Sequence, residues 1–202
     1  MINKIPKSCK VVVIGGGVAG CSTAYHLAKF GWKDTVLLER DILTSGTTWH
    51  AAGLIGQLGS SATITRLRNY SLNLYKKLEE ETGLSTGLKQ NGSLTVATTS
   101  DRLEELKRQL TFAQRFEIEA REVNNEDIKE IYPLVNTDDL VGGVFIKKDG
   151  QADPVGVTNV LAKAAKQNGA TIIEKCPVEK IITKNNKIVG VETKYGKIEC
   201  EY

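Results

Sequence analysis

The segment from Lys10 to Arg40 reads KVVVIGGGVAGCSTAYHLAKFGWKDTVLLER, and the order of its residue types decides the fold. An apolar run leads directly into three glycines, Gly15, Gly17 and Gly20, with the spacing G-x-G-x-x-G. In a βαβ unit that binds a dinucleotide, the first glycine permits a tight turn, the second lets the backbone approach a pyrophosphate, and the third lets the helix lie close to the strand.

The residues around these glycines supply the context that the motif needs. We predict a strand over Lys10–Ile14, a helix over Val18–Phe30 and a second strand over Thr35–Glu39. The unbroken valines of the first strand fit burial on both faces, as at the centre of a parallel sheet. The helix N-terminus offers N–H groups to phosphates. Glu39, about 20 residues past the turn, is predicted to accept hydrogen bonds from a ribose hydroxyl. The alternative is a glycine turn that only packs a βαβ unit.

The composition is that of an ordinary globular protein. The chain has 202 residues, 41% of them hydrophobic and 25% charged, with a net charge of +3 that is not clustered. This balance does not indicate a nucleic-acid partner. The apolar run Val11–Ile14 is too short for a membrane span or a secretory signal, so we expect no span and a cytoplasmic location. Four scattered cysteines predict reduced thiols and no metal site.

The rest of the chain leaves the βαβ pattern and then returns to it. A helix is predicted over Thr63–Thr82, and a mixture of separate strands and helices follows, including a helix capped by Ser100-Asp101. Asp153-Pro154 then begins a helix that leads to a third parallel strand and a small antiparallel meander. We therefore predict an α/β fold in three stretches: residues 1–85, an inserted lobe over 86–152, and a continuation over 153–202.

The loop after the second strand carries a family resemblance. Its residues Thr44–Gly53, TSGTTWHAAG, resemble the flavin-attachment loop of the sarcosine and dimethylglycine dehydrogenases, which are amine-oxidising flavoproteins related to glycine and D-amino acid oxidases. Five further stretches resemble the same family: Leu78–Gly83, Tyr132–Asn136, Asp149-Gly150, Asp153-Pro154 and Gly190–Thr193. The resemblance runs along essentially the whole chain. It implies a Rossmann-like FAD-binding domain with part of an inserted α+β substrate lobe.

The resemblance also implies a set of cofactor-binding residues. The histidine that matches His50 carries the FAD in that family, through a covalent bond to the 8α-methyl group of the isoalloxazine. Judged by its residue type alone, His50 is more simply a loop residue with satisfied hydrogen bonds. Val178 is expected to bind the adenine through its backbone. The full expected set is Gly15, Gly17, Val18, Ala19, Gly20, Glu39, Arg40, Ser45, Gly46, Thr47, Thr48, Trp49, His50, Ala51, Ala52, Gly53, Leu54 and Val178.

The chemistry implied by the resemblance is oxidation of an N-methyl amino acid. FAD takes a hydride from the N-methyl carbon, and the resulting iminium is hydrolysed or passes its one-carbon unit to tetrahydrofolate. An electron-transfer flavoprotein is the expected electron acceptor in the respiratory systems. The family's fold continues past the position of Tyr202, so we expect an N-terminal fragment or an incomplete gene product, with any folate site and the catalytic acid or base beyond it.

Two other functions remain as alternatives. The regulatory subunit of pyruvate dehydrogenase phosphatase is a non-catalytic relative that resembles this chain at Gly31–Asp34 and Lys197–Cys200, but it lacks the loop histidine that His50 supplies here. A nicotinamide-dependent dehydrogenase would share the glycine turn. The meander predicted over Asn185–Cys200 disfavours it, because such a domain normally continues its βαβ alternation.

Overall fold

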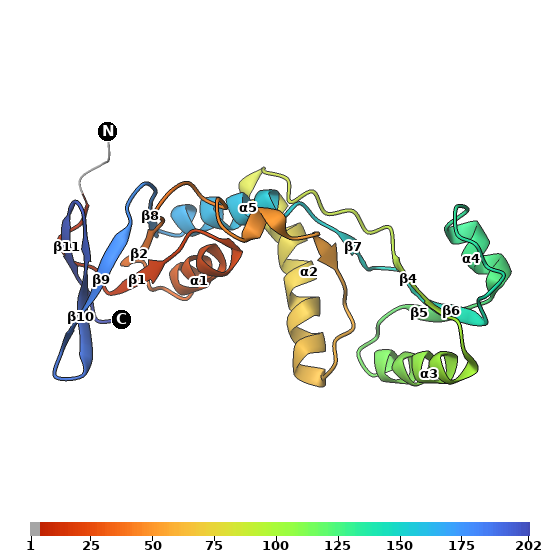
Figure 1. Ribbon diagram of the computed structural model, residues 1–202. Coiled ribbons are helices and arrows are strands. Elements are labelled where there is room, and N and C mark those ends of the chain that lie inside the picture. Colours follow the sequence, from red (N-terminus) through yellow and green to blue (C-terminus); the bar gives the residue numbers. More distant parts are fainter. Residues whose placement is uncertain (1–4) are drawn as a thin grey trace. The chain divides into compact units, whose positions relative to one another are not determined.

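The computed structural model describes residues 5–202, which form two compact units (Figure 1). The first unit comprises the chain up to Gly53, the segment Tyr75–Gly87 and the segment Asp153–Tyr202. The second unit comprises Leu54–Leu74 and Leu88–Ala152. The helix α2 (Ala62–Thr82) supplies residues to both units.

The first unit contains a parallel sheet and an antiparallel meander. Its remaining elements in chain order are β1 (Val11–Ile14), α1 (Val18–Lys29), β2 (Thr35–Leu38), the 3₁₀ turn η1 (Thr48–His50), α5 (Pro154–Gln167), β8 (Thr171–Ile173), β9 (Val178–Lys184), β10 (Lys187–Thr193) and β11 (Gly196–Glu199). The parallel sheet has the order β1-β2-β8, and the meander has the order β11-β10-β9. The predicted βαβ start and the predicted meander are therefore confirmed.

In the parallel sheet β2 lies between β1 and β8. All four residues of β2 are buried, whereas β1 becomes more exposed along its length and ends at Ile14, which is 51% exposed. The edge of β1 that faces away from β2 is also hydrogen-bonded, because the N–H of Val12 donates to the carbonyl of Tyr202 at 2.9 Å and the N–H of Glu201 donates to the carbonyl of Lys10 at 3.1 Å. An unbroken run of valines is typical of any inner parallel strand, and it does not specify the order of strands in the sheet.

Local signals mark the start of α5 and the end of α1. Asp153 caps α5 by accepting a hydrogen bond from the backbone N–H of Val155 at 3.0 Å, and Pro154 occupies the first turn. Gly31 follows α1 with a φ of 92°, a left-handed conformation that favours glycine. The helices α1 and α5 pack against each other beside the parallel sheet (Figure 1).

The second unit is built on an antiparallel sheet. Its elements in chain order are β3 (Leu54–Ile55), the first part of α2, β4 (Ser93–Ala97), α3 (Ser100–Gln114), β5 (Ala120–Val123), α4 (Asn125–Ile131), β6 (Gly142–Ile146) and β7 (Gly150–Gln151). The sheet has the order β4-β6-β5, and β3 pairs with β7. Thr99, rather than the predicted Ser100-Asp101, caps α3: its hydroxyl accepts from the N–H of Arg102 at 3.2 Å. Thr99 takes this role because its backbone is still extended, whereas Ser100 is already helical.

Candidate dinucleotide-binding site

A cavity of about 600 Å³ lies at the carboxyl ends of β1 and β2 in the first unit. Its walls come from the glycine turn, the start of α1, the end of β2, the loop before and within η1, and the start of β9. The lining residues are Ile14, Gly15, Gly16, Gly17, Val18, Ala19, Leu38, Glu39, Arg40, Gly46, Thr47, Thr48, Ala51, Pro177 and Val178. The carboxyl ends of parallel strands are the edge at which open α/β sheets bind their ligands.

Each glycine of the motif meets a specific steric demand. Gly15 has a φ of 109°, which an L side chain rarely adopts. A Cβ atom on Gly20 would lie 1.9 Å from the carbonyl oxygen of Gly15, so only glycine lets α1 start this close to the turn. A Cβ atom on Gly17 would lie 2.9 Å from the hydroxyl oxygen of Thr48.

Gly16 is a site residue that the sequence analysis did not include. A Cβ atom on Gly16 would lie 2.6 Å from Cδ2 of Leu43 and 2.9 Å from Cβ of Glu39. The run of three consecutive glycines was the available signal, but the spacing G-x-G-x-x-G leaves the residue at x unspecified. Its role depends on the side chains of Glu39 and Leu43, more than 20 positions further along the chain.

The carboxylate of Glu39 connects the glycine turn to the end of β2. Its Oε2 accepts a hydrogen bond from the N–H of Gly16 at 2.6 Å, and its Oε1 accepts one from the N–H of Asp41 at 2.8 Å. The side chain lines the cavity although the residue is only 8% exposed. Because each carboxylate oxygen has two acceptor positions, Glu39 can still accept a hydroxyl from a ligand.

Thr48 caps α1 from a distant part of the chain. The N-cap residue of this helix is Gly17, which has no side chain to cap it, and the hydroxyl oxygen of Thr48 instead accepts from the N–H of Val18 at 3.0 Å. The next N–H groups of a first helical turn have no acceptor within the helix. Val18 and Ala19 line the cavity, so this helix end can receive an anion there.

These features fit a dinucleotide. The left-handed Gly15, the glycines without room for a side chain and the helix N-terminus suit a pyrophosphate, and the Glu39 carboxylate suits a ribose.

The structure brings most of the expected site residues together. Those that line the cavity are Gly15, Gly17, Val18, Ala19, Glu39, Arg40, Gly46, Thr47, Thr48, Ala51 and Val178. Gly20 does not line the cavity but packs against the backbone of Gly15. Leu54 belongs to the second unit. The remaining members, Ser45, Trp49, His50, Ala52 and Gly53, belong to the same loop but are not among the residues that line this cavity. Their contact with a cofactor stays a prediction.

His50 is exposed at the end of η1. Its backbone N–H donates to the carbonyl of Thr47 at 3.2 Å, which closes the 3₁₀ turn. Its ring lies against the ring of Trp49, with 3.8 Å between the ring centroids and 33° between the ring planes. The prediction of a covalent flavin at this imidazole is not tested by these contacts.

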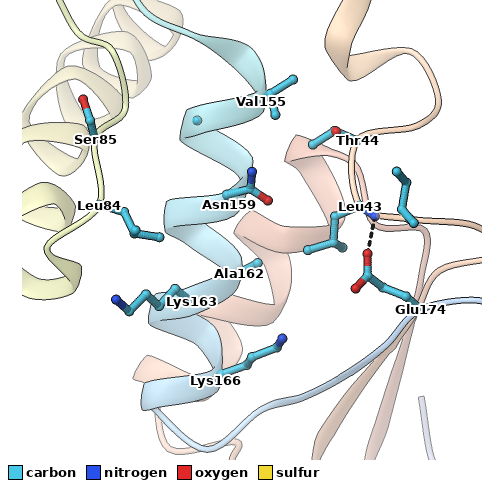
Figure 2. A pocket seen from close by; sticks show the side chains of 12 residues that line it. Leu43, Thr44, Leu84, Ser85, Val155, Asn159, Ala162, Lys163, Lys166 and Glu174 are labelled. Carbon is cyan, nitrogen blue, oxygen red and sulfur yellow. Dashed lines mark hydrogen bonds between the residues drawn. The ribbon is translucent and has the colours of Figure 1, made fainter. Parts of the chain in front are cut away.

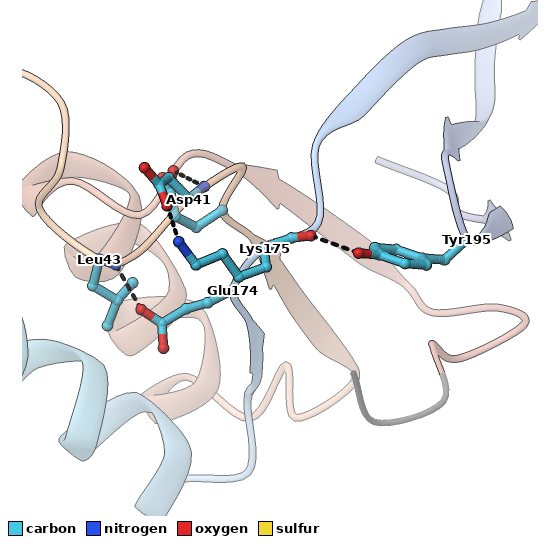
Figure 3. Close-up of polar contacts among 6 residues, drawn as sticks. Asp41, Leu43, Glu174, Lys175 and Tyr195 are labelled. Atoms are coloured by element: carbon cyan, nitrogen blue, oxygen red, sulfur yellow. Dashed lines mark hydrogen bonds and ion pairs between the residues drawn. The ribbon is translucent and has the colours of Figure 1, made fainter. Parts of the chain in front are cut away.

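The end of β8 holds the turn that follows β2. The Oε1 atom of Glu174 accepts from the N–H of Leu43 at 2.6 Å, and the ammonium of Lys175 pairs with the carboxylate of Asp41 (Figure 3). The Lys175 hydrogen bond and charge hold the pKa of Asp41 below its usual value. Tyr195 of the meander donates its hydroxyl to the Lys175 carbonyl at 3.2 Å. These contacts position Leu43, which in turn packs against Gly16.

A second cavity in the first unit, of about 750 Å³, lies beside the same turn (Figure 2). Leu43, Thr44 and Glu174 form part of its wall, and α5 contributes Asn159, Lys163 and Lys166. Two residues in its wall, Glu174 and Leu43, are therefore the ones whose hydrogen bond positions Leu43 against Gly16.

No helix within residues 5–202 is long and apolar enough to cross a membrane. The same residues hold no cluster of three or more His, Cys, Asp or Glu side chains arranged to bind a metal ion.

The parallel sheet, the glycine turn and the cavity at its carboxyl edge define a dinucleotide-binding domain with an inserted second unit. Residues 10–202 match the family model described as "DAO: FAD dependent oxidoreductase". The chain belongs to this family of FAD-dependent oxidoreductases.

Several curated proteins are similar to the chain over nearly all of its length. Mitochondrial sarcosine dehydrogenase of Homo sapiens is 44% identical over 96% of the chain, and mitochondrial dimethylglycine dehydrogenase of Homo sapiens is 40% identical over 95%. The mitochondrial pyruvate dehydrogenase phosphatase regulatory subunit of Mus musculus is 39% identical over 98%. The chain spans 22% of the length of each of the two dehydrogenases and 23% of the regulatory subunit. The resemblance to sarcosine and dimethylglycine dehydrogenases is thus confirmed.

Among solved structures, L-proline dehydrogenase from P. horikoshii is similar with a TM-score of 0.90 and 31% sequence identity. The match covers 98% of this chain and 52% of that one. The predicted α/β fold class with an FAD-binding domain is therefore confirmed.

Proposed function

We propose that this chain forms the FAD-binding part of an enzyme that oxidises an N-methyl amino acid of the sarcosine or dimethylglycine type. The observation that carries the proposal is the cavity at the glycine turn, in which a helix N-terminus and the Glu39 carboxylate are arranged for the two polar parts of a dinucleotide. Membership of the FAD-dependent family supports FAD as that dinucleotide, and the names of the dehydrogenase relatives support an N-methyl amine as the substrate.

Each part of the cavity has a role in this proposal. The start of α1, with Thr47 and Thr48, binds the pyrophosphate, and Glu39 binds the adenosine ribose with Arg40 beside it. The backbone of Val178, at the start of β9, binds the adenine. When bound, FAD supplies the acceptor for the hydride of the N-methyl carbon. The chain's own residues hold the cofactor, and we assign none of them as a catalytic acid or base.

We further propose that the imidazole of His50 bonds covalently to the flavin. Its place in the chain supports this, because Thr48, two residues before His50, and Ala51, directly after it, both line the cavity. The exposed imidazole is also not engaged in any hydrogen bond or ion pair within residues 5–202. Transfer of the one-carbon unit to tetrahydrofolate and of electrons to an electron-transfer flavoprotein belongs to the same proposal, with no residue of this chain assigned to either.

Acid precipitation after incubation with FAD tests both parts of the proposal. We expect the protein to bind FAD, to keep part of the flavin in the acid pellet, and to yield a flavin-bearing peptide that contains Trp49-His50. The His50→Ala variant should bind FAD but release all of it in acid. A wild-type protein that binds no FAD would contradict the site itself. A His50→Ala variant that retains its flavin would contradict the attachment alone.

Substrate class requires a separate measurement on the intact gene product. We expect sarcosine or dimethylglycine, added without oxygen, to bleach the visible absorption of the bound flavin, and glycine to have no such effect. Bleaching by glycine but not by either N-methyl compound would contradict the proposed substrate class.

A second candidate is a non-catalytic regulatory subunit, because the phosphatase regulatory subunit is nearly as similar to the chain as dimethylglycine dehydrogenase is. The presence of His50 favours the enzyme, because the loop histidine is the residue proposed here to attach the flavin. If the protein binds flavin and no N-methyl amine bleaches the flavin absorption, the result would favour the assignment as a regulatory subunit.

A further inference from the structure

The two side chains at the end of η1 form an unusual pair. Trp49 and His50 are consecutive residues, and their ring centroids are only 3.8 Å apart. A 3₁₀ turn has about three residues per turn, so consecutive side chains leave it about 120° apart. The backbone therefore does not force these rings together. Their stacking results from the rotamers that the two side chains adopt.

Hydrogen bonds fix the backbone at this pair, whereas the imidazole ring of His50 contacts only the indole of Trp49 among the ring, hydrogen-bond and ion-pair partners within residues 5–202. Thr48 is buried and bonded to Val18, and the N–H of His50 donates to Thr47. Within residues 5–202, the imidazole itself takes part in no hydrogen bond or ion pair, and its one ring contact is with Trp49. Trp49 is 56% exposed, so its indole is not held there by burial in a core.

We propose that Trp49 is a positioning residue that stacks on the imidazole of His50 and holds it in the orientation that bonds to the flavin. This inference rests on the proposed covalent attachment at His50. Aromatic rings in contact favour offset and tilted arrangements, and an exposed indole can hold a neighbouring ring without a hydrogen bond. The stack keeps the imidazole in one rotamer before the cofactor arrives.

The bond that this orientation serves can be written in balanced form. An imidazole nitrogen bonds to the 8α carbon of FAD, so one C–H bond and one N–H bond are replaced by one C–N bond. Two protons and two electrons are released, and the isoalloxazine takes them up to become the reduced flavin. Dioxygen then reoxidises the flavin and is reduced to hydrogen peroxide. The protein's contribution is the position of the nitrogen.

The size of the effect follows from the rotamers that the stack excludes. A free histidine side chain has three staggered χ1 positions and about two ring orientations, which gives about six states. If Trp49 selects one of them, its removal should slow covalent attachment by about three- to sixfold. Non-covalent FAD binding should change by less than about twofold, because Trp49 does not line the cavity.

The first test follows the stack in the protein without flavin. The chain has only two histidines, so the ring protons of His50 and His26 can be resolved by NMR and assigned with His50→Ala. We expect the His50 signals to move downfield in Trp49→Ala, because the ring current of the indole is lost, and the His26 signals to stay unchanged. Unchanged His50 signals would overturn the proposal.

The second test follows covalent attachment over time in the wild type, Trp49→Ala, Trp49→Phe and Trp32→Phe. Trp32 is the other tryptophan of the chain and contacts Lys10 and Tyr202, so it controls for the loss of an indole elsewhere. We expect slow attachment in Trp49→Ala only, with Trp49→Phe close to the wild type because it keeps an aromatic face.

The outcomes separate this inference from the proposed function. If the wild type attaches flavin and Trp49→Ala attaches it equally fast, the positioning role of Trp49 is wrong and the attachment stands. If the wild type binds FAD but never attaches it, the attachment is wrong and the inference falls with it. Equal slowing in Trp32→Phe would show a general loss of stability and would also overturn the inference.

Discussion

Replacing Glu39 by glutamine tests the carboxylate that joins the glycine turn to β2. Both oxygens of Glu39 accept a backbone N–H, from Gly16 and from Asp41. A glutamine amide has one oxygen that accepts and one NH₂ group that only donates. In Glu39→Gln one of the two backbone N–H groups therefore loses its acceptor and faces another donor.

The expected cost is that of a lost hydrogen bond to a charged, buried acceptor, which is about 1.5 to 3 kcal/mol. For a chain of this size, each kcal/mol lowers the melting temperature by about 2 to 4 °C, so the melting temperature should fall by about 3 to 12 °C. We also expect weaker binding of FAD, because the same carboxylate is proposed to bind the ribose.

Tryptophan fluorescence during thermal unfolding measures this effect, because both tryptophans, Trp32 and Trp49, belong to the first unit. Glu174→Gln is a matched control. Within residues 5–202, only one oxygen of Glu174 accepts a hydrogen bond, from the N–H of Leu43, and an amide oxygen can replace it. The control should unfold within about 0.5 kcal/mol of the wild type. Equal stability of both variants and the wild type would refute the bridging role of Glu39.

Three further predictions concern other parts of the first unit. In Gly20→Ala the new Cβ atom would lie 1.9 Å from the carbonyl oxygen of Gly15, so we expect a loss of about 3 kcal/mol in urea unfolding, together with weaker FAD binding. The hydroxyl and N–H of Thr86 hold the pKa of Glu79 below its usual value. This stabilises the fold above the ordinary glutamate pKa of about 4.3 and is lost as the pH falls towards the lower folded value, so Glu79→Gln should flatten the acid side of the stability–pH curve. An unchanged acid side would contradict this. Burial raises the pKa of Cys21 to about 12, so mass spectrometry should find this thiol unmodified by iodoacetamide at neutral pH in the native protein and alkylated after unfolding.

The features that the sequence predicted well depend on residues close together in the chain. The glycine turn, the Asp153-Pro154 start of α5 and the antiparallel meander each follow from local conformational preferences. The family resemblance added FAD, which the spacing of glycines alone does not distinguish from other dinucleotides.

The features that the sequence did not predict depend on contacts between distant residues. Thr48 caps a helix that begins 30 residues earlier, and the importance of Gly16 arises from the side chains of Glu39 and Leu43. The position of β2 between β1 and β8 depends on the pairing of β2 with a strand that follows it by more than 130 residues. The strands β3 and β7 have two residues each, too few for a periodic pattern.

The division of the chain into units has a consequence for how such a protein can change over evolution. The chain passes between the two units after Gly53, Leu74, Gly87 and Ala152, and the passage after Leu74 lies within α2. Neither unit is therefore a continuous segment that recombination could exchange whole. A single crossover after Gly53 or Ala152 would mix parental sequences in the first unit, and one after Leu74 or Gly87 would mix them in both units. A crossover after Leu74 lies inside α2 and would also have to preserve the helical register of that element. Variation in the second unit is consequently expected to accumulate by point substitution and loop insertion, while its junctions with the first unit stay in place.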